Sequence, residues 1–480
     1  MYSMLTSAWT LMLLIPGAEP PADNPWPARL RELLSAAQAA PADVLDAAWR
    51  ADDWQVGLEH ARRLLAVEPI PPKLQGLVVR ALWRAGQLAD AEALAAKLPR
   101  DTRDPVALRG LIELESARGG PAAVRPLVER LAARSALTAE DLLALFNQRF
   151  LAGEMEGLAD LARRVEKLID PADGYPSLYM SEAVEGVAEY LAAIGPQPLN
   201  QLAEPGAAPM PPLPLFKLPS CDVLINGRGP YRMVVDTGGS LIIALDQTVA
   251  DELNLKSVAP GSIRGASGKT ETGQIVLDDV QLGSIRLRRV IGRTFDVRSA
   301  VLNAADGVLG TGVFLGGRMT LDFAGGQLAV ARSSEKPGPG RAVDARVISD
   351  AKLIVPLTLG AQTGVGLLDT GADVIALAPS RLKQLFPDRD LPTLNTSIAI
   401  GVGSGEQTSI TTSAGVTVAF GDHEFKNCGG LGLDVLDKTL SPALGLQIDI
   451  LLGMPAFREM KTCTVDFPTC RMWIDWQTAP

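Results

Sequence analysis

Two aspartates stand at the ends of apolar runs, and each is followed at once by Thr and Gly. Asp236 lies in "MVVDTGGSLIIAL" and Asp369 lies in "GLLDTGADVIAL". A buried carboxylate is costly in its charged form unless a neighbouring group can share its proton. Two carboxylates within hydrogen-bond distance cannot both stay ionised, so one accepts a proton from water while the other donates one. This pair of residues therefore predicts hydrolysis by general acid–base chemistry.

The segments that follow the two aspartates are also similar. "ADGVLGTGVF" contains Asp306 and "IDILLGMPAF" contains Asp449, and both read Asp-x-apolar-Leu-Gly. Further on, "MTLDFAGGQLAV" contains Asp322 and "CTVDFPTCRMWI" contains Asp466. We interpret these four later aspartates as residues that cap turns or hairpin ends. The repeated order of motifs predicts two copies of one β domain.

Asp-Thr-Gly followed by an apolar-apolar-Gly segment, given twice, resembles the aspartic peptidases. "LLDTGAD" is closest to the retropepsin form, and "VVDTGGS" is nearer to the pepsin form and to bacterial retropepsin-like domains. The resemblance implies an all-β pseudo-dimeric acid-protease barrel pair, in which each lobe contributes one Asp about a pseudo-twofold axis. Because both copies lie in one chain, we expect a monomer; the alternative is that each lobe pairs with a lobe of another chain. The implied substrate is a peptide or protein, and no metal or cofactor is expected.

The resemblance assigns roles to the residues beside the two aspartates. The two threonines are expected to hydrogen-bond across the loops, and the two glycines are expected to permit a tight loop. Gly310 and Gly453 are expected to let their segments pack closely behind the loops. The catalytic residues are then Asp236 and Asp369, and the residues that support their loops are Thr237, Gly238, Thr370 and Gly371.

Two Gly-rich hairpins, "RGASGKTETG" and "IGVGSGEQTS", resemble the flaps that cover substrate in this family. An ordinary surface turn remains an equal alternative for each. The last tyrosine, Tyr231, precedes both hairpins, which favours a retropepsin-like flap. Ser240 stands where the other copy has Asp373, and in retropepsins the equivalent Asp joins an ion pair and contacts the substrate backbone. The candidates for substrate or flap contact are Gly265, Gly268, Gly401, Gly403 and Asp373.

Composition excludes several other kinds of site. The formal net charge of -10 argues against binding nucleic acid, which needs clustered Lys and Arg. The two histidines, His60 and His423, are far apart, so a Ser-His-Asp triad or a His-based zinc site is not expected. The four cysteines show no Cys-x-x-Cys spacing. Cys463 and Cys470 either form a disulfide or remain buried thiols.

The N-terminal segment predicts export. Residues 1–26 contain an apolar stretch too short to span a bilayer, followed by a polar, Pro-rich stretch, as in a signal peptide and polar lead. We expect a periplasmic or secreted protein with no stable membrane anchor. The protein is cytoplasmic if this segment is not a signal.

Residues 27–195 predict a helical array. Ala- and Leu-rich segments that begin at Ala48 and Leu82 are 34 residues apart (82 − 48) and resemble tetratricopeptide repeats. The resemblance implies a groove that binds a protein partner. We expect a Pro-rich linker at 196–214, lobe 1 at 215–333, a connector at 334–349 and lobe 2 at 350–480.

Two functions follow from these features. The first is an aspartic endopeptidase in which Asp236 and Asp369 activate a water molecule and the helical repeats recruit or gate substrate. The second is a catalytically inactive scaffold that binds a peptide in the same cleft. The intact Asp and Thr of both motifs favour the first. The sequence does not predict the substrate, the pH optimum or a zymogen.

Overall fold

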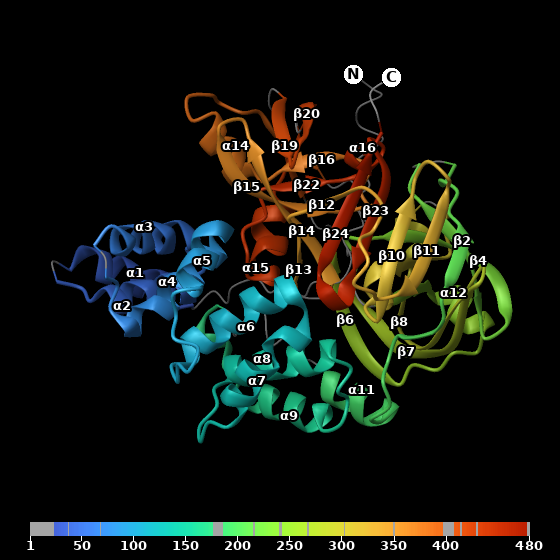
Figure 1. The fold of residues 1–480 in the computed structure, drawn as a ribbon, viewed down its shortest axis with the longest axis horizontal. Coiled ribbons are helices and arrows are strands. Elements are labelled where there is room, and N and C mark those ends of the chain that lie inside the picture. Colours follow the sequence, from blue (N-terminus) through green and yellow to red (C-terminus); the bar gives the residue numbers. More distant parts are fainter. Residues whose placement is uncertain are drawn as a thin grey trace.

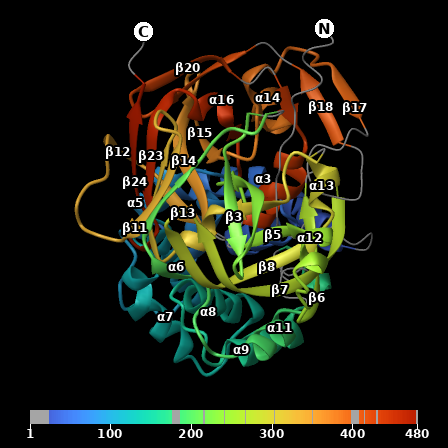
Figure 2. The same cartoon turned by 90° about the vertical axis from the view of Figure 1, so that its right-hand side faces the viewer.

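The computed structural model places a helical region before two β lobes, as the sequence predicted (Figure 1). In both views the helices α7 (Arg125–Ala132), α8 (Ala139–Leu151), α9 (Leu158–Leu168) and α11 (Val187–Ile194) lie below the sheets, while β20 (His423–Cys428) of lobe 2 lies near the top (Figures 1 and 2). The structure describes residues 24–477 except for 37, 68, 176–185, 215–216, 240–241, 266–267, 302, 349–350, 397–407, 413–414 and 429–430.

The helical region consists of successive helical hairpins: α2 with α3, α4 with α5, α6 with α7, and α8 with α9. Gly86, Gly120 and Gly153 lie in turns of this region with φ of +72°, +75° and +72°, where L side chains are strained. The helices are α1 (Trp26–Ser35), α2 (Pro41–Arg50), α3 (Trp54–Leu65), α4 (Pro72–Arg84), α5 (Leu88–Ala95), α6 (Pro105–Gly119), α7 (Arg125–Ala132), α8 (Ala139–Leu151), α9 (Leu158–Leu168) and α11 (Val187–Ile194).

Lobe 1 is built on an eight-stranded sheet with the order β1-β8-β5-β9-β4-β3-β7-β6. Its apolar strands are short, and β5 and β9 are buried along their whole length. The strands of lobe 1 are β3 (Ser220–Ile225), β4 (Arg228–Asp236), β5 (Ile243–Asp246), β6 (Ala259–Gly265), β7 (Gly268–Leu282), β8 (Ile285–Phe295), β9 (Gly307–Gly310), β10 (Gly317–Asp322) and β11 (Gln327–Arg332).

Lobe 2 is built on a ten-stranded sheet with the order β17-β18-β21-β16-β22-β15-β14-β19-β20, in which β13 also pairs with β14. The strands of lobe 2 are β13 (Arg346–Ile348), β14 (Lys352–Leu359), β15 (Gln362–Leu368), β16 (Ile375–Leu377), β17 (Thr393–Thr396), β18 (Thr408–Thr412), β19 (Val416–Phe420), β20 (His423–Cys428), β21 (Leu431–Leu433), β22 (Ile450–Leu452), β23 (Met460–Asp466) and β24 (Arg471–Trp476).

The two lobes share one strand plan. In lobe 1, β3 and β4 form an antiparallel hairpin, β9 runs parallel to β4, and β5 runs antiparallel to β9 and parallel to β8. In lobe 2, β14, β15, β22, β16 and β21 repeat these relations in the same order. The internal duplication read from the motifs is therefore a duplication of topology.

A six-stranded sheet joins the lobes, with the order β12-β24-β23-β10-β11-β2, where β12 (Arg341–Val343) lies in the connector. At its centre β10 of lobe 1 pairs antiparallel with β23 of lobe 2, and the Thr320 and Thr464 hydroxyls lie 2.9 Å apart. Arg318 donates to Asp466 across the same pair of strands at 2.7 Å. The two lobes thus pair with each other within this chain.

The Pro-rich segment that precedes lobe 1 forms part of both sheets. β1 (Gln201–Glu204) pairs with β8 in lobe 1, and β2 (Gly206–Pro209) pairs with β11 in the interlobe sheet. Both strands lie at sheet edges, where proline is tolerated because fewer backbone N–H groups are needed. The segment predicted as a linker therefore also bridges lobe 1 to the interlobe sheet.

The helical array is bonded to the β lobes. Glu92 of α5 forms an ion pair with the buried Arg346 of β13 at 2.6 Å, and Gln447 N–H donates to the Arg84 carbonyl at 2.8 Å. A Cβ at Gly120 would lie 2.3 Å from the Pro468 carbonyl oxygen, so the array and lobe 2 approach closely there. The array is fixed against the lobes by specific contacts.

Several smaller sequence predictions have clear outcomes. Cys463 and Cys470 are free buried thiols, which resolves the open alternative against a disulfide. Trp83 is buried in the array, as expected for a core residue, while Trp49 is half-buried and packs edge-on against Tyr175 at 4.7 Å. Within the described ranges, no helix is both long and apolar enough to cross a membrane.

Candidate active site

The strand plan carries the two Asp-Thr-Gly loops to one place. Asp236 is the last residue of β4, where it is in register with Gly310 at the end of β9. Asp369 follows β15 directly, and its N–H donates to the Leu452 carbonyl of β22 at 3.0 Å. Each Asp-Thr-Gly loop therefore lies beside the end of a parallel strand that carries the predicted glycine. This strand is β9 with Gly310 in lobe 1 and β22, followed by Gly453, in lobe 2.

The two threonines bond across the lobes in a reciprocal pattern. The Thr370 hydroxyl accepts from Thr237 N–H at 2.9 Å and donates to the Val235 carbonyl at 2.8 Å. The Thr237 hydroxyl accepts from Thr370 N–H at 2.9 Å and donates to the Leu368 carbonyl at 2.9 Å. Both threonines are fully buried. These four bonds agree with the role that the family resemblance implied.

The two glycines of the motif lie against the opposite carboxylates. A Cβ on Gly238 would lie 2.3 Å from Asp369 Cγ, and a Cβ on Gly371 would lie 2.6 Å from Asp236 Cγ. Any side chain at either position would collide with the carboxyl group of the other lobe. The absence of a Cβ is therefore what allows the two carboxyl groups to approach.

Both aspartates are fully buried, and both pKa values are raised. For Asp236, burial and then the negative charge of Asp369 raise the pKa well above its usual range. For Asp369, burial raises the pKa to about 6, partly offset by hydrogen bonds from Asp236 and from Gly371 N–H. A proton is thus retained between the two groups near neutral pH.

One of the four carboxyl oxygens of the pair accepts a regular hydrogen bond from the backbone. Gly371 N–H donates to Asp369 Oδ1 at 2.8 Å. Within the described residues, both carboxyl oxygens of Asp236 and Oδ2 of Asp369 are buried without a donor in a regular hydrogen bond. Two deprotonated carboxylates have no proton to exchange, whereas one shared proton supplies a hydrogen bond between them. The geometry therefore favours the singly protonated pair.

Lys352 is a site residue that the sequence reasoning missed. It is the first residue of β14, it is fully buried, and its Nζ donates to the Gly239 carbonyl of lobe 1 at 3.1 Å. The available signal was a lysine at the start of the apolar run "KLIVPL". That signal does not predict that the side chain points into the protein, because a lysine at a strand end is ordinarily solvated.

Asp306 and Asp449 are equivalent, but the prediction that they cap turns is wrong. Asp306 accepts from Arg232 N–H and from Arg298, and Asp449 accepts from Val365 N–H and from Arg381. Each carboxylate thus braces the strand that leads into an Asp-Thr-Gly loop, and an arginine neutralises its charge.

The other two later aspartates differ from each other. Asp322 accepts from Gly325 N–H at 2.7 Å at the end of the β10–β11 hairpin, as predicted. Asp466 is fully buried and instead binds Arg318 and the Ser333 hydroxyl, so its role is to tie the lobes together. The repeated "Asp-Phe" sequence therefore has different partners in the two copies.

The flap candidates are only partly within the described structure. Gly265 and Gly268 face each other at the end of the β6–β7 hairpin. Gly401 and Gly403 lie outside the described residues, between the paired strands β17 and β18. Asp373 is half-buried and follows the second loop directly. Each lobe thus contains a hairpin at the expected place in its sequence.

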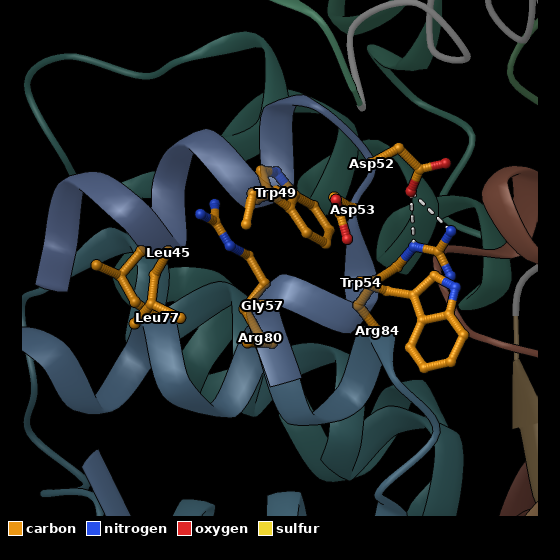
Figure 3. A pocket seen from close by; sticks show the side chains of 11 residues that line it. Leu45, Trp49, Asp52, Asp53, Trp54, Gly57, Leu77, Arg80 and Arg84 are labelled. Carbon is orange, nitrogen blue, oxygen red and sulfur yellow. Dashed lines mark hydrogen bonds and ion pairs between the residues drawn. The ribbon is translucent and has the colours of Figure 1, made fainter. Parts of the chain in front are cut away.

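The pockets of the helical region lie elsewhere. Figure 3 shows a small pocket between α2, α3 and α4, beside the Asp52–Arg84 ion pair. Its volume is about 10 Å³, which leaves room for about one water molecule.

A larger cavity, of about 610 Å³, lies between the array and lobe 2. Glu113 lines this cavity, and desolvation by the surrounding protein raises its pKa to about 7. Asp236 and Asp369 line neither space.

Comparison with known proteins gives a family match in each of the two lobes. A family model described as aspartyl protease matches residues 221–313 and 355–456, so that each match contains one Asp-Thr-Gly loop and its Gly-containing segment. A similar solved structure is a retropepsin-like aspartic protease from Rickettsia conorii, with 19% sequence identity and a TM-score of 0.19, covering 26% of this chain and 91% of that chain. The curated proteins contain no match to this chain.

Proposed function

We propose, from two lobes that match the aspartyl protease family, that this chain is an aspartic endopeptidase whose catalytic pair is Asp236 and Asp369. One observation carries the proposal. The reciprocal bonds of Thr237 and Thr370 hold two buried carboxyl groups together, and both have raised pKa values. Such a pair shares one proton, which is the state that acid–base hydrolysis requires.

The chemistry needs only these two groups and a water molecule. The ionised carboxylate removes a proton from water while the water oxygen forms a bond to the peptide carbonyl carbon. The protonated carboxyl group donates its proton to the carbonyl oxygen, giving a neutral tetrahedral intermediate. The carboxyl group that took the water proton then donates it to the leaving nitrogen, and the other carboxylate takes a proton from one hydroxyl of the intermediate as the C–N bond breaks. The products are a carboxylic acid and an amine, and the pair is again singly protonated.

Access is the condition that this proposal must meet. Both carboxyl groups are 0% exposed, so a peptide reaches them only if the segments around the pair move apart. The β6–β7 hairpin, which ends in Gly265 and Gly268, is a candidate for such a movement because hinged loops commonly cover active sites.

The same burial favours the second candidate function, a catalytically inactive scaffold that binds a peptide. In that case Asp236 and Asp369 stabilise the lobe interface and no opening delivers water to them. The intact Asp, Thr and Gly of both loops argue for catalysis, because an inactive scaffold has no need of two proton-sharing carboxyl groups.

We further propose that the helical array recruits or gates a protein substrate, and that the active unit is an exported monomer. The array is bonded to lobe 2 through Glu92 and Arg346 and borders the cavity of about 610 Å³. A partner segment in that cavity would touch both the array and lobe 2. A partner bound in this cavity would therefore contact lobe 2 directly, and this contact is how partner binding would affect the proposed active site.

The experiment is cleavage of a diverse peptide library and of an unfolded protein by the purified full chain. The endopeptidase predicts cleavage that Asp236→Asn and Asp369→Asn each abolish while circular dichroism shows an unchanged fold. The scaffold predicts peptide binding with no cleavage by the wild type. Retention of cleavage by either single variant would rule out the shared pair.

A further inference from the structure

The two lobes differ at one position directly beside the catalytic loops. Ser220 pairs with Val234, so counting two residues further places Leu218 opposite Asp236. Ile354 pairs with Leu367, so the same count places Lys352 opposite Asp369. The equivalence is supported by the residues just before, since Lys217 and Ala351 both adopt positive φ, at +55° and +63°.

Lys352 belongs to lobe 2 but bonds to the loop of lobe 1. Its Nζ lies 3.1 Å from the Gly239 carbonyl oxygen, and no part of its side chain is exposed. Gly239 in turn lies against Asp236, because a Cβ built on Gly239 would be 3.3 Å from Asp236 Cγ. The ammonium group is therefore within the same desolvated cluster as the carboxyl pair.

We propose that Lys352 is a positioning residue that holds the Asp236 loop in place and whose positive charge sets the pH range in which the carboxyl pair is singly protonated. This inference rests on the proposed peptidase function, which it deepens. A cation in a desolvated cluster offsets the single negative charge of the active pair, which burial alone disfavours.

The sign of the effect follows from the charges that face the pair. Besides the two aspartates, the strongest charge effect on the pair comes from Lys352, which lowers both pKa values. The remaining main influences are backbone N–H groups, those of Gly239, Gly371 and Ala372. Removal of the Lys352 charge therefore shifts both proton losses, and both limbs of the activity profile, to higher pH.

The test compares three variants of the full chain. Lys352→Met removes the charge and the donor, Lys352→Gln removes the charge and keeps a donor, and Lys352→Arg keeps both. We expect both limbs of the kcat profile to move up by about one to three pH units in Lys352→Met and Lys352→Gln. We expect Lys352→Arg to keep the wild-type limbs even where its rate is lower.

The matched control is Leu218→Met, at the equivalent position of lobe 1, which should leave the limbs in place. A merely structural lysine would lower activity at every pH without moving the limbs, and that result would overturn the proposal. If the limbs move in Lys352→Met but stay in place in Lys352→Gln, the charge of Lys352 does not set the pH range, and the electrostatic part of the proposal is refuted.

A second measurement keeps the inference independent of catalysis. Nuclear magnetic resonance of 13C-labelled aspartate carboxyl groups follows the titration of the pair directly, in the wild type and in Lys352→Gln. A higher carboxyl pKa in the variant supports the role of Lys352 even if no peptide is cleaved. Unchanged carboxyl titration refutes it even if the wild type is an active peptidase.

Discussion

Lobe 1 and lobe 2 are similar in the cross-lobe bonds of their Asp-Thr-Gly loops and different behind these loops. The Thr237 and Thr370 bonds are reciprocal, with lengths of 2.8 to 2.9 Å in both directions. Behind the loops, lobe 1 has a half-exposed Arg298–Asp306 pair, whereas the equivalent Arg381–Asp449 pair of lobe 2 is buried. Lobe 2 also carries the buried Lys352. Symmetry is thus retained where the lobes must meet, while the Arg–Asp pair behind the loop is more deeply buried in lobe 2 than in lobe 1.

The largest effect should come from the symmetric part. Asp236→Asn and Asp369→Asn should each lower kcat/KM by about 10²- to 10⁴-fold or more, because each removes one partner of the proton transfer. Steady-state cleavage of an unfolded protein measures this. A large loss for one substitution and near-normal activity for the other would break the equivalence of the lobes.

The asymmetric ion pairs should respond unequally. Arg381→Met leaves the buried Asp449 charge uncompensated and should lower the free energy of unfolding by about 3–5 kcal/mol. Arg298→Met removes a more exposed pair and should cost about 1 kcal/mol or less. Urea denaturation compares the two. Equal losses would show that the difference in burial between the lobes has no energetic consequence.

The carboxyl pair should make stability depend on pH. The pKa of Asp369 is raised in the folded state to about 6, so the folded chain binds more protons than the unfolded chain above about pH 4. The free energy of unfolding should therefore fall as pH rises from about 4 through 6, by about 3 kcal/mol from this group. Asp369→Asn should remove much of this fall. Thermal unfolding from pH 4 to 7.5 measures it, and a parallel pH dependence in both proteins would contradict the prediction.

The threonine substitutions test whether the two lobes contribute equally to stability at their reciprocal bonds. Thr237→Val and Thr370→Val each leave one buried N–H and one buried carbonyl without a partner. Each should lower the free energy of unfolding by about 1–3 kcal/mol, and the two losses should agree. Denaturation midpoints test this, with Thr320→Val in the interlobe sheet as the control. That control removes one hydroxyl contact and should cost about 0.5–1.5 kcal/mol.

The repeated motifs were sufficient to predict the two lobes, because motif order is preserved in both copies. The meeting of Asp236 with Asp369 and the cross-lobe bonds of the threonines followed from the family resemblance. Neither Lys352 nor the Arg381–Asp449 pair could be predicted. Arg381 and Asp449 are 68 residues apart, and whether a lysine at a strand end points inward depends on packing between lobes. Such contacts depend on tertiary structure and leave no local pattern.

The Pro-rich segment shows the same limit in secondary structure. Its prolines predict an extended linker, and its strands β1 and β2 form only because β8 and β11 offer free edges. The propensity of the segment is low, so pairing with an existing sheet decides its conformation.

The interlobe sheet has a consequence for biosynthesis. The sheet combines strands from distant parts of the chain. β2 at residues 206–209 and β10 at 317–322 share it with β23 and β24, of which β24 ends at Trp476. A nascent chain that already contains both aspartates still lacks these two strands, and so cannot form the interlobe sheet. Contacts between such distant segments also form slowly. The interlobe sheet can therefore form only after synthesis has passed residue 476, well after both Asp-Thr-Gly loops have been made.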